Sequence, residues 1–189
     1  MKFDNSFVVP IPPAEAWPLL LDVPTIAPCL PGAQITEVLN PRKFKGRASV
    51  KIGPVQLNFD GEAEIVDVDD QAMTARVVAK GNEKKGRGNA SATASFSLAP
   101  DPAGAKITVE TELSLVGSIA QYGRGVGLIK DISNQLITQF AKNLESVIRT
   151  AAGEAGVEAP VAGKPISGLG LLGGAIKAAV TRKFSNNPS

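Results

Sequence analysis

The sequence contains no histidine among its 189 residues. Histidine is the commonest general base at neutral pH and the commonest metal ligand, so its absence argues against histidine-based catalysis and against most metal sites. The single cysteine, Cys29, cannot form an internal disulfide, and we expect it to be a small buried residue. A zinc site would have to combine carboxylates with one thiol, so we expect no metal.

Aromatic residues and net charge are also scarce. Aromatics make up 5% of the chain and the formal net charge is +2. Both values are too low for base stacking or for a phosphate-binding surface, so we expect no nucleic-acid partner. The first residues, MKFDNSFVVPIPP, lack the apolar run and cleavage site of a secretory signal, which predicts a cytoplasmic protein.

Alternating apolar and polar residues predict a mainly antiparallel sheet. A first strand ends at Pro10, a short helix follows at PPAEAWPLLLD, and about six more strands occupy the chain up to residue 118. In RKFKGRASVKI the outward positions are basic, whereas in VQLNFDGEAEIVDV they are acidic. Opposite charges on facing strands favour pairing, so these two segments are predicted to form a hairpin around Gly53-Pro54.

One long amphipathic helix is predicted from GLIKDISNQLITQFAKNLESVIRTAA, where apolar residues recur every three or four positions. This apolar stripe needs a partner, and the half-apolar sheet is the only candidate. An antiparallel sheet covered on one side by a long C-terminal helix is an α+β fold, of the helix-grip arrangement.

The inward face of ASATASFSL is unusually small, because Ala90, Ala92 and Ala94 precede Phe96 on it. Small inward residues leave volume between sheet and helix, which predicts an apolar cavity; a bulky helix packed closely there is the alternative. The segment QYGRGVG is interpreted as a flexible entry to the long helix, presenting Tyr122 at its mouth.

Few charged groups are expected inside such a cavity. The pairs Glu62/Glu64 and Glu110/Glu112 lie on outward positions, so we expect no catalytic role for them. The loop GNEKKGRGN, with Glu83 among its cations, is interpreted as a solvated edge, with a docking patch for an acidic partner as the alternative. An apolar pocket with few ionisable groups favours binding over catalysis, so we do not expect an enzyme.

Three segments together resemble the G-subunit family of carbon monoxide dehydrogenase, within the START-like, polyketide-cyclase-related superfamily. They are APCLPGA, FKGRASVKIGPVQLNFDGEAEI and GRGVGLIKDISNQLITQFAKNLE. The resemblance implies a helix-grip domain over residues 1–152 that serves a molybdenum-containing carbon monoxide dehydrogenase or related hydroxylase without being its catalytic subunit. It also implies a link between that enzyme and the membrane.

An apolar electron carrier such as menaquinone or ubiquinone is the natural occupant of such a cavity. The residues expected to line it are Trp17, Phe59, Ala92, Phe96, Leu113, Tyr122, Ile129, Ile132, Leu136 and Phe140. An assembly factor with a closed core, or a cyclase- or hydrolase-like enzyme acting on an apolar substrate, are the alternatives.

The C-terminal segment 168–189 is too short in apolar residues, and too rich in glycine and cations, to span a bilayer. It is predicted to be an amphipathic helix on the inner membrane surface, tethered by a flexible linker at 153–167. A helix bound within the protein or to a partner is the alternative. The residues expected to contact lipid are Leu169, Leu172, Ile176, Lys177, Val180, Arg182, Lys183 and Phe184.

Overall fold

The computed structural model describes residues 1–124 and 126–153, so the expected tail at 168–189 and all but the first residue of the expected linker lie outside it. In chain order the elements are β1 (Lys2–Val9), α1 (Pro13–Leu21), α2 (Val23–Ile26), the 3-10 helix η1 (Ala27–Cys29), β2 (Ala33–Asn40), β3 (Lys43–Ile52), β4 (Val55–Asp69), β5 (Thr74–Glu83), β6 (Gly88–Asp101), β7 (Gly104–Gly117), α3 (Ala120–Gly123) and α4 (Val126–Ala151).

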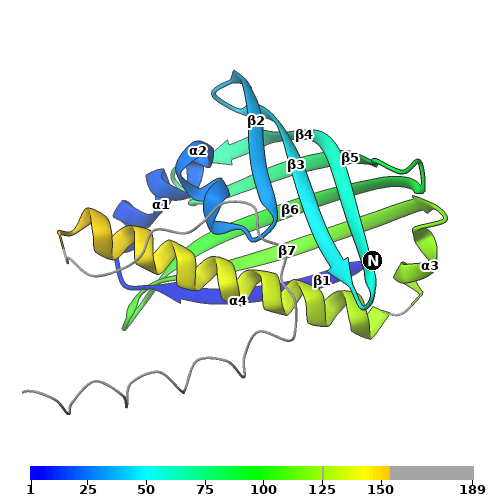
Figure 1. Ribbon diagram of the computed structural model, residues 1–189. Helices are drawn as coiled ribbons and strands as arrows, with labels where there is room; N and C mark the ends of the chain where they lie inside the picture. The colour runs from blue at the N-terminus through cyan, green and yellow to red at the C-terminus, as the bar shows by residue number, and fades with distance from the viewer. Residues whose placement is uncertain (125, 154–189) are drawn as a thin grey trace, which may run out of the picture.

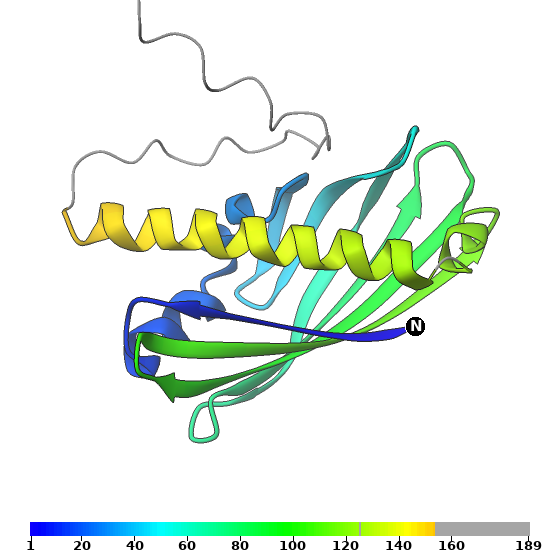
Figure 2. The same ribbon diagram turned by 90° about the horizontal axis from the view of Figure 1, so that it is seen from below.

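The strands form one antiparallel sheet in the order β1-β7-β6-β5-β4-β3-β2. Figure 1 shows this sheet curving around α4, with α1 and α2 at one end of the long helix and α3 at the other. Seen from below in Figure 2, α4 runs beside β1 while the other strands bend away behind it. The predicted helix-grip fold is confirmed.

The β3–β4 hairpin has the register that its charges predicted. Lys43 lies opposite Glu64, Lys45 opposite Glu62 and Arg47 opposite Asp60, so three of the four basic residues of β3 face an acid on β4, while Lys51 faces Gln56. These side chains share the outer face of the sheet. Their apolar neighbours on both strands therefore turn toward α4, as strand alternation requires.

Polar contacts fasten α4 to the rest of the domain at two places along its length. Ser133 Oγ donates to Asn5 Oδ1 at 2.8 Å, and Asn5 Nδ2 donates to Asn134 Oδ1 at 2.7 Å, which joins the helix to β1. About two and a half turns after Asn134, Asn143 Nδ2 donates to the backbone oxygen of Cys29 in η1 at 2.8 Å. The position of the helix above the sheet is thus fixed by specific bonds as well as by apolar packing.

Most of the buried apolar residues form two separate clusters, and Phe44 and Ile65 are buried outside both. The first cluster lies at the α1 end and contains the buried residues Val9, Ala16, Trp17, Leu20, Cys29, Ala75, Leu98, Ala105, Ile107, Leu144 and Ile148. The second cluster lies at the α3 end and contains the buried residues Ile52, Leu57, Ile119 and Ile129. Burying a large aliphatic side chain contributes about 1.5–3 kcal/mol, so the first cluster dominates the stability of the fold.

A row of glycines crosses the sheet beside the second cluster. Gly46, Gly61 and Gly81 are directly paired on β3, β4 and β5. A Cβ on Gly61 would lie 2.1 Å from the backbone oxygen of Lys80, and one on Gly46 would lie 2.7 Å from that of Gln34. Only glycine permits such a close approach, so this row allows the sheet to bend sharply here.

Candidate functional site

The inner face between the two clusters is apolar but incompletely covered. This inner band consists of Ala63, Val77, Ala79, Ala92 and Ala94 from β4–β6 and Leu136 from α4. All six are half-buried, and none belongs to either cluster. Ala63, Ala79 and Ala92 are consecutive partners across three strands, so the band is continuous. The site is therefore an apolar interior that solvent reaches, in contrast to a closely packed core.

The residues predicted to line a cavity divide among these regions. Trp17 is buried in the first cluster, where its Nε1 donates to Asp70 Oδ1 at 2.8 Å, and Phe96 and Phe140 pack against the same cluster. Phe59, Leu113, Tyr122, Ile129 and Ile132 gather at the second cluster. Ala92 and Leu136 lie in the inner band. The predicted set thus spans the length of the interior, and its members do not form one contact group.

A charged pair lies at the α3 end of this interior. Glu83 is the last residue of β5, its side chain is completely buried, and it lies opposite Phe59 in the β4–β5 ladder. Its Oε1 accepts from Arg87 Nη2 at 2.8 Å, and its Oε2 accepts from the backbone nitrogens of Lys85 at 2.8 Å and Arg87 at 3.4 Å. The charge of the buried carboxylate is therefore compensated by donors of the β5–β6 turn that follows it.

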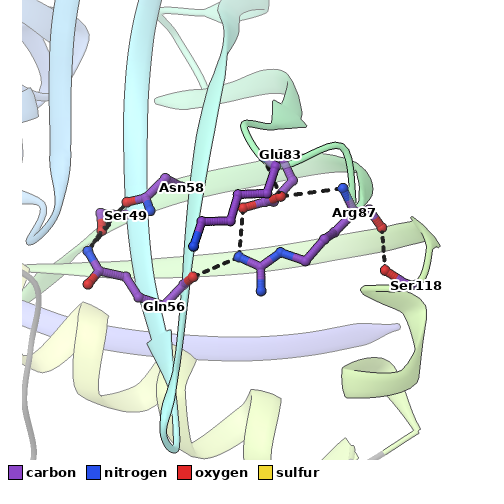
Figure 3. A network of polar contacts seen from close by, with 7 residues as sticks. Ser49, Gln56, Asn58, Glu83, Arg87 and Ser118 are labelled. Atoms are coloured by element: carbon purple, nitrogen blue, oxygen red, sulfur yellow. Dashed lines mark hydrogen bonds and ion pairs between the residues drawn. The ribbon is translucent and has the colours of Figure 1, made fainter.

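Arg87 connects this turn to two neighbouring elements, as Figure 3 shows. Its Nη2 also donates to the backbone oxygen of Gln56, at the start of β4, at 2.9 Å. Its backbone oxygen accepts from Ser118 Oγ at 2.9 Å and from the backbone nitrogen of Ile119 at 3.2 Å. One arginine thus joins the β3–β4 turn, the β5–β6 turn and the approach to α3.

The electrostatics of this pair favour the ionised state. The hydrogen bond from Arg87, assisted by backbone donors, lowers the pKa of Glu83 to about 2, although burial opposes the shift. In return, the hydrogen bond to Glu83 raises the pKa of Arg87, and the nearby Tyr122 acts in the same direction. Neither group is poised to exchange a proton near neutral pH, which weighs against a role as a general acid or base.

The prediction of a solvated edge for this loop is correct for Lys84 and Lys85 and wrong for Glu83. The alternation of β5, in which Ala75, Val77, Ala79 and Gly81 face inward, continues to Glu83 and directs its carboxylate to the inner face. The same alternation is present in the sequence, where the basic residues around Glu83 obscure it.

The outer face of the sheet carries a broad hollow of about 830 Å³ over β3, β4 and β5. Most of its charged groups are already paired: Lys43 lies 3.3 Å from Glu62 and 3.6 Å from Glu64, and Arg47 lies 3.2 Å from Asp60. The carboxylates of Glu110 and Glu112 are exposed on this face as well, as predicted. A surface on which most charges are neutralised by neighbours offers little net attraction to a charged ligand.

Two observations on residues 1–124 and 126–153 bear on metals and membranes. No group of three or more Cys, Asp or Glu side chains comes together there in a way that could hold a metal ion. In the same residues, no helix is long and apolar enough to cross a bilayer. Cys29 is fully buried as predicted, and burial raises the pKa of its thiol.

Comparison with protein families decides the assignment. The family model described as the carbon monoxide dehydrogenase G subunit (CoxG) matches residues 6–149. The chain belongs to this family. The match covers the sheet from within β1 and nearly all of α4, so membership applies to the domain that contains the inner band. No curated protein matches the chain significantly.

Solved structures support the fold of this CoxG-family domain. A conserved protein from Geobacillus kaustophilus superposes with a TM-score of 0.68 at 20% identity, covering 80% of this chain and 97% of that one. A protein from Thermus thermophilus gives 0.57 at 15% identity, covering 80% and 99%. An aromatase/cyclase from Streptomyces gives 0.55 at 10% identity, covering 83% and 99%. At these identities the similarity shows the fold alone.

Proposed function

We propose that this chain is a non-catalytic accessory protein of a molybdenum-containing carbon monoxide dehydrogenase or a related hydroxylase. In this proposal it binds an apolar molecule, a quinone such as menaquinone or ubiquinone, between α4 and the inner face of the sheet. CoxG-family membership supports the partner enzyme. The inner band supports the ligand, because it offers apolar surface that the protein's own side chains leave partly uncovered.

The lack of unpaired charge facing the inner band supports binding over catalysis. Among the described residues, Glu83 is the buried charged residue, and its carboxylate is held by Arg87 and by backbone donors. A hydrolase or cyclase acting in this interior would need polar groups that converge on a substrate. Ala63, Ala79 and Ala92 supply none, so the interior is suited to hold an apolar molecule without changing it.

The ligand proposal can be tested by filling the inner band. Ala92→Trp would place a large side chain among Ala79 and Leu113, its partners on the neighbouring strands, and should abolish binding. The matched control is Ser91→Trp, one residue earlier, whose side chain points to the outer face. Binding of decylubiquinone, a short-chain quinone, would be measured by native mass spectrometry in all three proteins, and by quenching of the single tryptophan, Trp17, in the wild type.

We expect wild type and Ser91→Trp to bind decylubiquinone and Ala92→Trp to bind none. Equal binding by all three proteins would place the ligand outside the inner band. Failure of the wild type to retain decylubiquinone, or any apolar molecule from a lipid extract, would contradict the carrier function and favour an assembly factor.

The membrane link in this proposal rests on the sequence of residues 168–189. Their apolar residues recur at helical spacing beside Lys177, Arg182 and Lys183, a pattern that favours weak, reversible binding to anionic lipid. We expect the full chain to sediment with phosphatidylglycerol vesicles at low salt, and a chain lacking residues 168–189 to remain in the supernatant with its decylubiquinone affinity intact. Sedimentation of the truncated chain would contradict this assignment.

A further inference from the structure

The guanidinium of Arg87 has more donors than the protein uses. Its Nη2 donates to Glu83 and to the backbone oxygen of Gln56. Its Nε is buried and has no partner, the one such side-chain nitrogen or oxygen within residues 1–124 and 126–153. A buried donor without an acceptor is unfavourable, so natural proteins rarely leave one unpaired without a functional reason.

Arg87 also lies where the interior meets the α3 end. Figure 3 shows its side chain extended between the β3–β4 turn and α3, with its one unbonded terminal nitrogen, Nη1, directed away from both Glu83 and Gln56. Phe59, opposite Glu83, and Tyr122, whose phenol contributes to the raised pKa of Arg87, pack against the second cluster. Spare polar donors therefore stand beside apolar surface that is continuous with the inner band.

We propose that the unused N–H groups of Arg87 donate a hydrogen bond to a neutral carbonyl oxygen at the polar end of the bound molecule. This inference rests on the proposed function and specifies its ligand class: an apolar body whose polar end is an uncharged acceptor, as in a quinone. The apolar body lies along the inner band, and the carbonyl lies at the α3 end. Arg87 is thus a binding residue that orients the ligand.

The charge balance of the site favours a neutral acceptor over an anion. Glu83 already compensates the charge of Arg87, so a buried carboxylate from a fatty acid would add an uncompensated negative charge. The nearby Lys84 lies 3.3 Å from Asp60 on the outer face, and Lys85 is exposed. No second cation of the described loop is placed to neutralise an anion inside. A carbonyl oxygen uses the spare donors without this cost.

The test compares ligands that have alkyl chains of similar length and different head groups. Decylubiquinone, decylbenzene and dodecanoate would be titrated against the full-length wild type and two variants. Glu83→Gln/Arg87→Met removes both partners of the ion pair, so that no unpaired charge remains buried. Lys85→Met is the matched control, because it removes an exposed cation from the same turn. Unfolding curves would establish that all three proteins fold.

We expect Glu83→Gln/Arg87→Met to bind decylubiquinone about 10-fold or more weakly, the effect of losing one hydrogen bond to a charged donor. Its affinity for decylbenzene should equal that of the wild type, and dodecanoate should bind the wild type more weakly than the quinone does. Infrared difference spectra should show the C=O stretch of ¹³C-labelled decylubiquinone at lower frequency in the wild type and in Lys85→Met than in the double variant.

Several outcomes would overturn the inference while leaving the proposed function intact. If the double variant lost the same factor of affinity for decylubiquinone and for decylbenzene, Arg87 would act only by holding the turns together. An unchanged carbonyl frequency in the double variant would mean that Arg87 makes no bond to the ligand. Tight, Arg87-dependent binding of dodecanoate would assign an anionic ligand instead. By contrast, failure of the wild type to bind either uncharged compound would contradict the proposed function itself.

Discussion

The two ends of the interior are built differently, although α4 runs through both. At the α1 end the first cluster closes the space with large buried side chains, and Leu144 of α4 is 1% exposed there. At the α3 end the second cluster is smaller and stands next to a buried ion pair and a glycine row. The difference indicates a division of labour in which one end supplies stability and the other offers polar groups and access.

The largest expected effect tests this division along a single helix. Leu144→Ala should destabilise the folded state by about 2–5 kcal/mol, because it opens a cavity in a closed cluster. The matched change two turns earlier, Leu136→Ala, removes a half-buried side chain of the inner band and should cost well under half as much. Urea unfolding of the ligand-free proteins measures both values. Equal costs would mean that the inner band is packed as tightly as the first cluster.

On acidification, the α3 end and the α1 end of the interior should lose their structure at different pH values. Glu83 has a pKa of about 2 in the folded state, against an ordinary value of 4.5. Because the folded pKa is the lower one, ionised Glu83 stabilises the fold above about pH 4.5, and this contribution is lost as the pH falls from there toward 2. We therefore expect the α3 end to loosen first.

The chain carries its own probes for this experiment, with one tryptophan and one tyrosine. Trp17 reports on the first cluster and Tyr122 on the second. Fluorinated analogues at these positions should show the Tyr122 resonance changing at higher pH than that of Trp17. In Glu83→Gln the separation should shrink. Simultaneous changes at both probes in the wild type would show that the ends unfold as one unit.

The smallest expected effect concerns the entry to α4. Gly127 lies in the first turn of the helix, and a Cβ there would meet no atom within 4 Å. Gly127→Ala should therefore raise stability by about 0.4–1 kcal/mol, mainly by restricting the unfolded chain. Thermal unfolding measures this gain. A loss of stability, or slower uptake of decylubiquinone with a gain in stability, would show that freedom at this glycine serves the α3 end.

The sequence predicts the fold well because its strongest signals are local. Alternation predicts the faces of β3 and β4, and the charges of Lys43, Lys45 and Arg47 identify β4 as the partner of β3. The apolar stripe of α4 places its helix to within a residue at each end. Such patterns lie within one or two neighbouring elements, where periodicity is sufficient.

The candidate site is less accessible to sequence reasoning because it depends on register across several strands. The alignment of Gly46, Gly61 and Gly81 appears only once three strands are paired. The bond of Trp17 to Asp70, distant in sequence, places it in the first cluster, a position that the sequence pattern alone does not give. Glu83 and Arg87 can form an ion pair only because β5 ends at Glu83 and the chain then turns back. The alternation of apolar and polar residues does not by itself show where β5 ends.

The glycine row shapes the sheet through backbone contact. Gly46 and Gly61 let the backbones of neighbouring strands approach more closely than a residue with a Cβ would allow. The alanines of the inner band lie on strands whose positions they do not determine. Replacing Ala63, Ala79 or Ala94, one at a time, by a larger residue should therefore reduce the length of the molecules that the protein binds. The sheet itself should keep its shape, so the ligand length that this domain accepts can be changed without changing the fold.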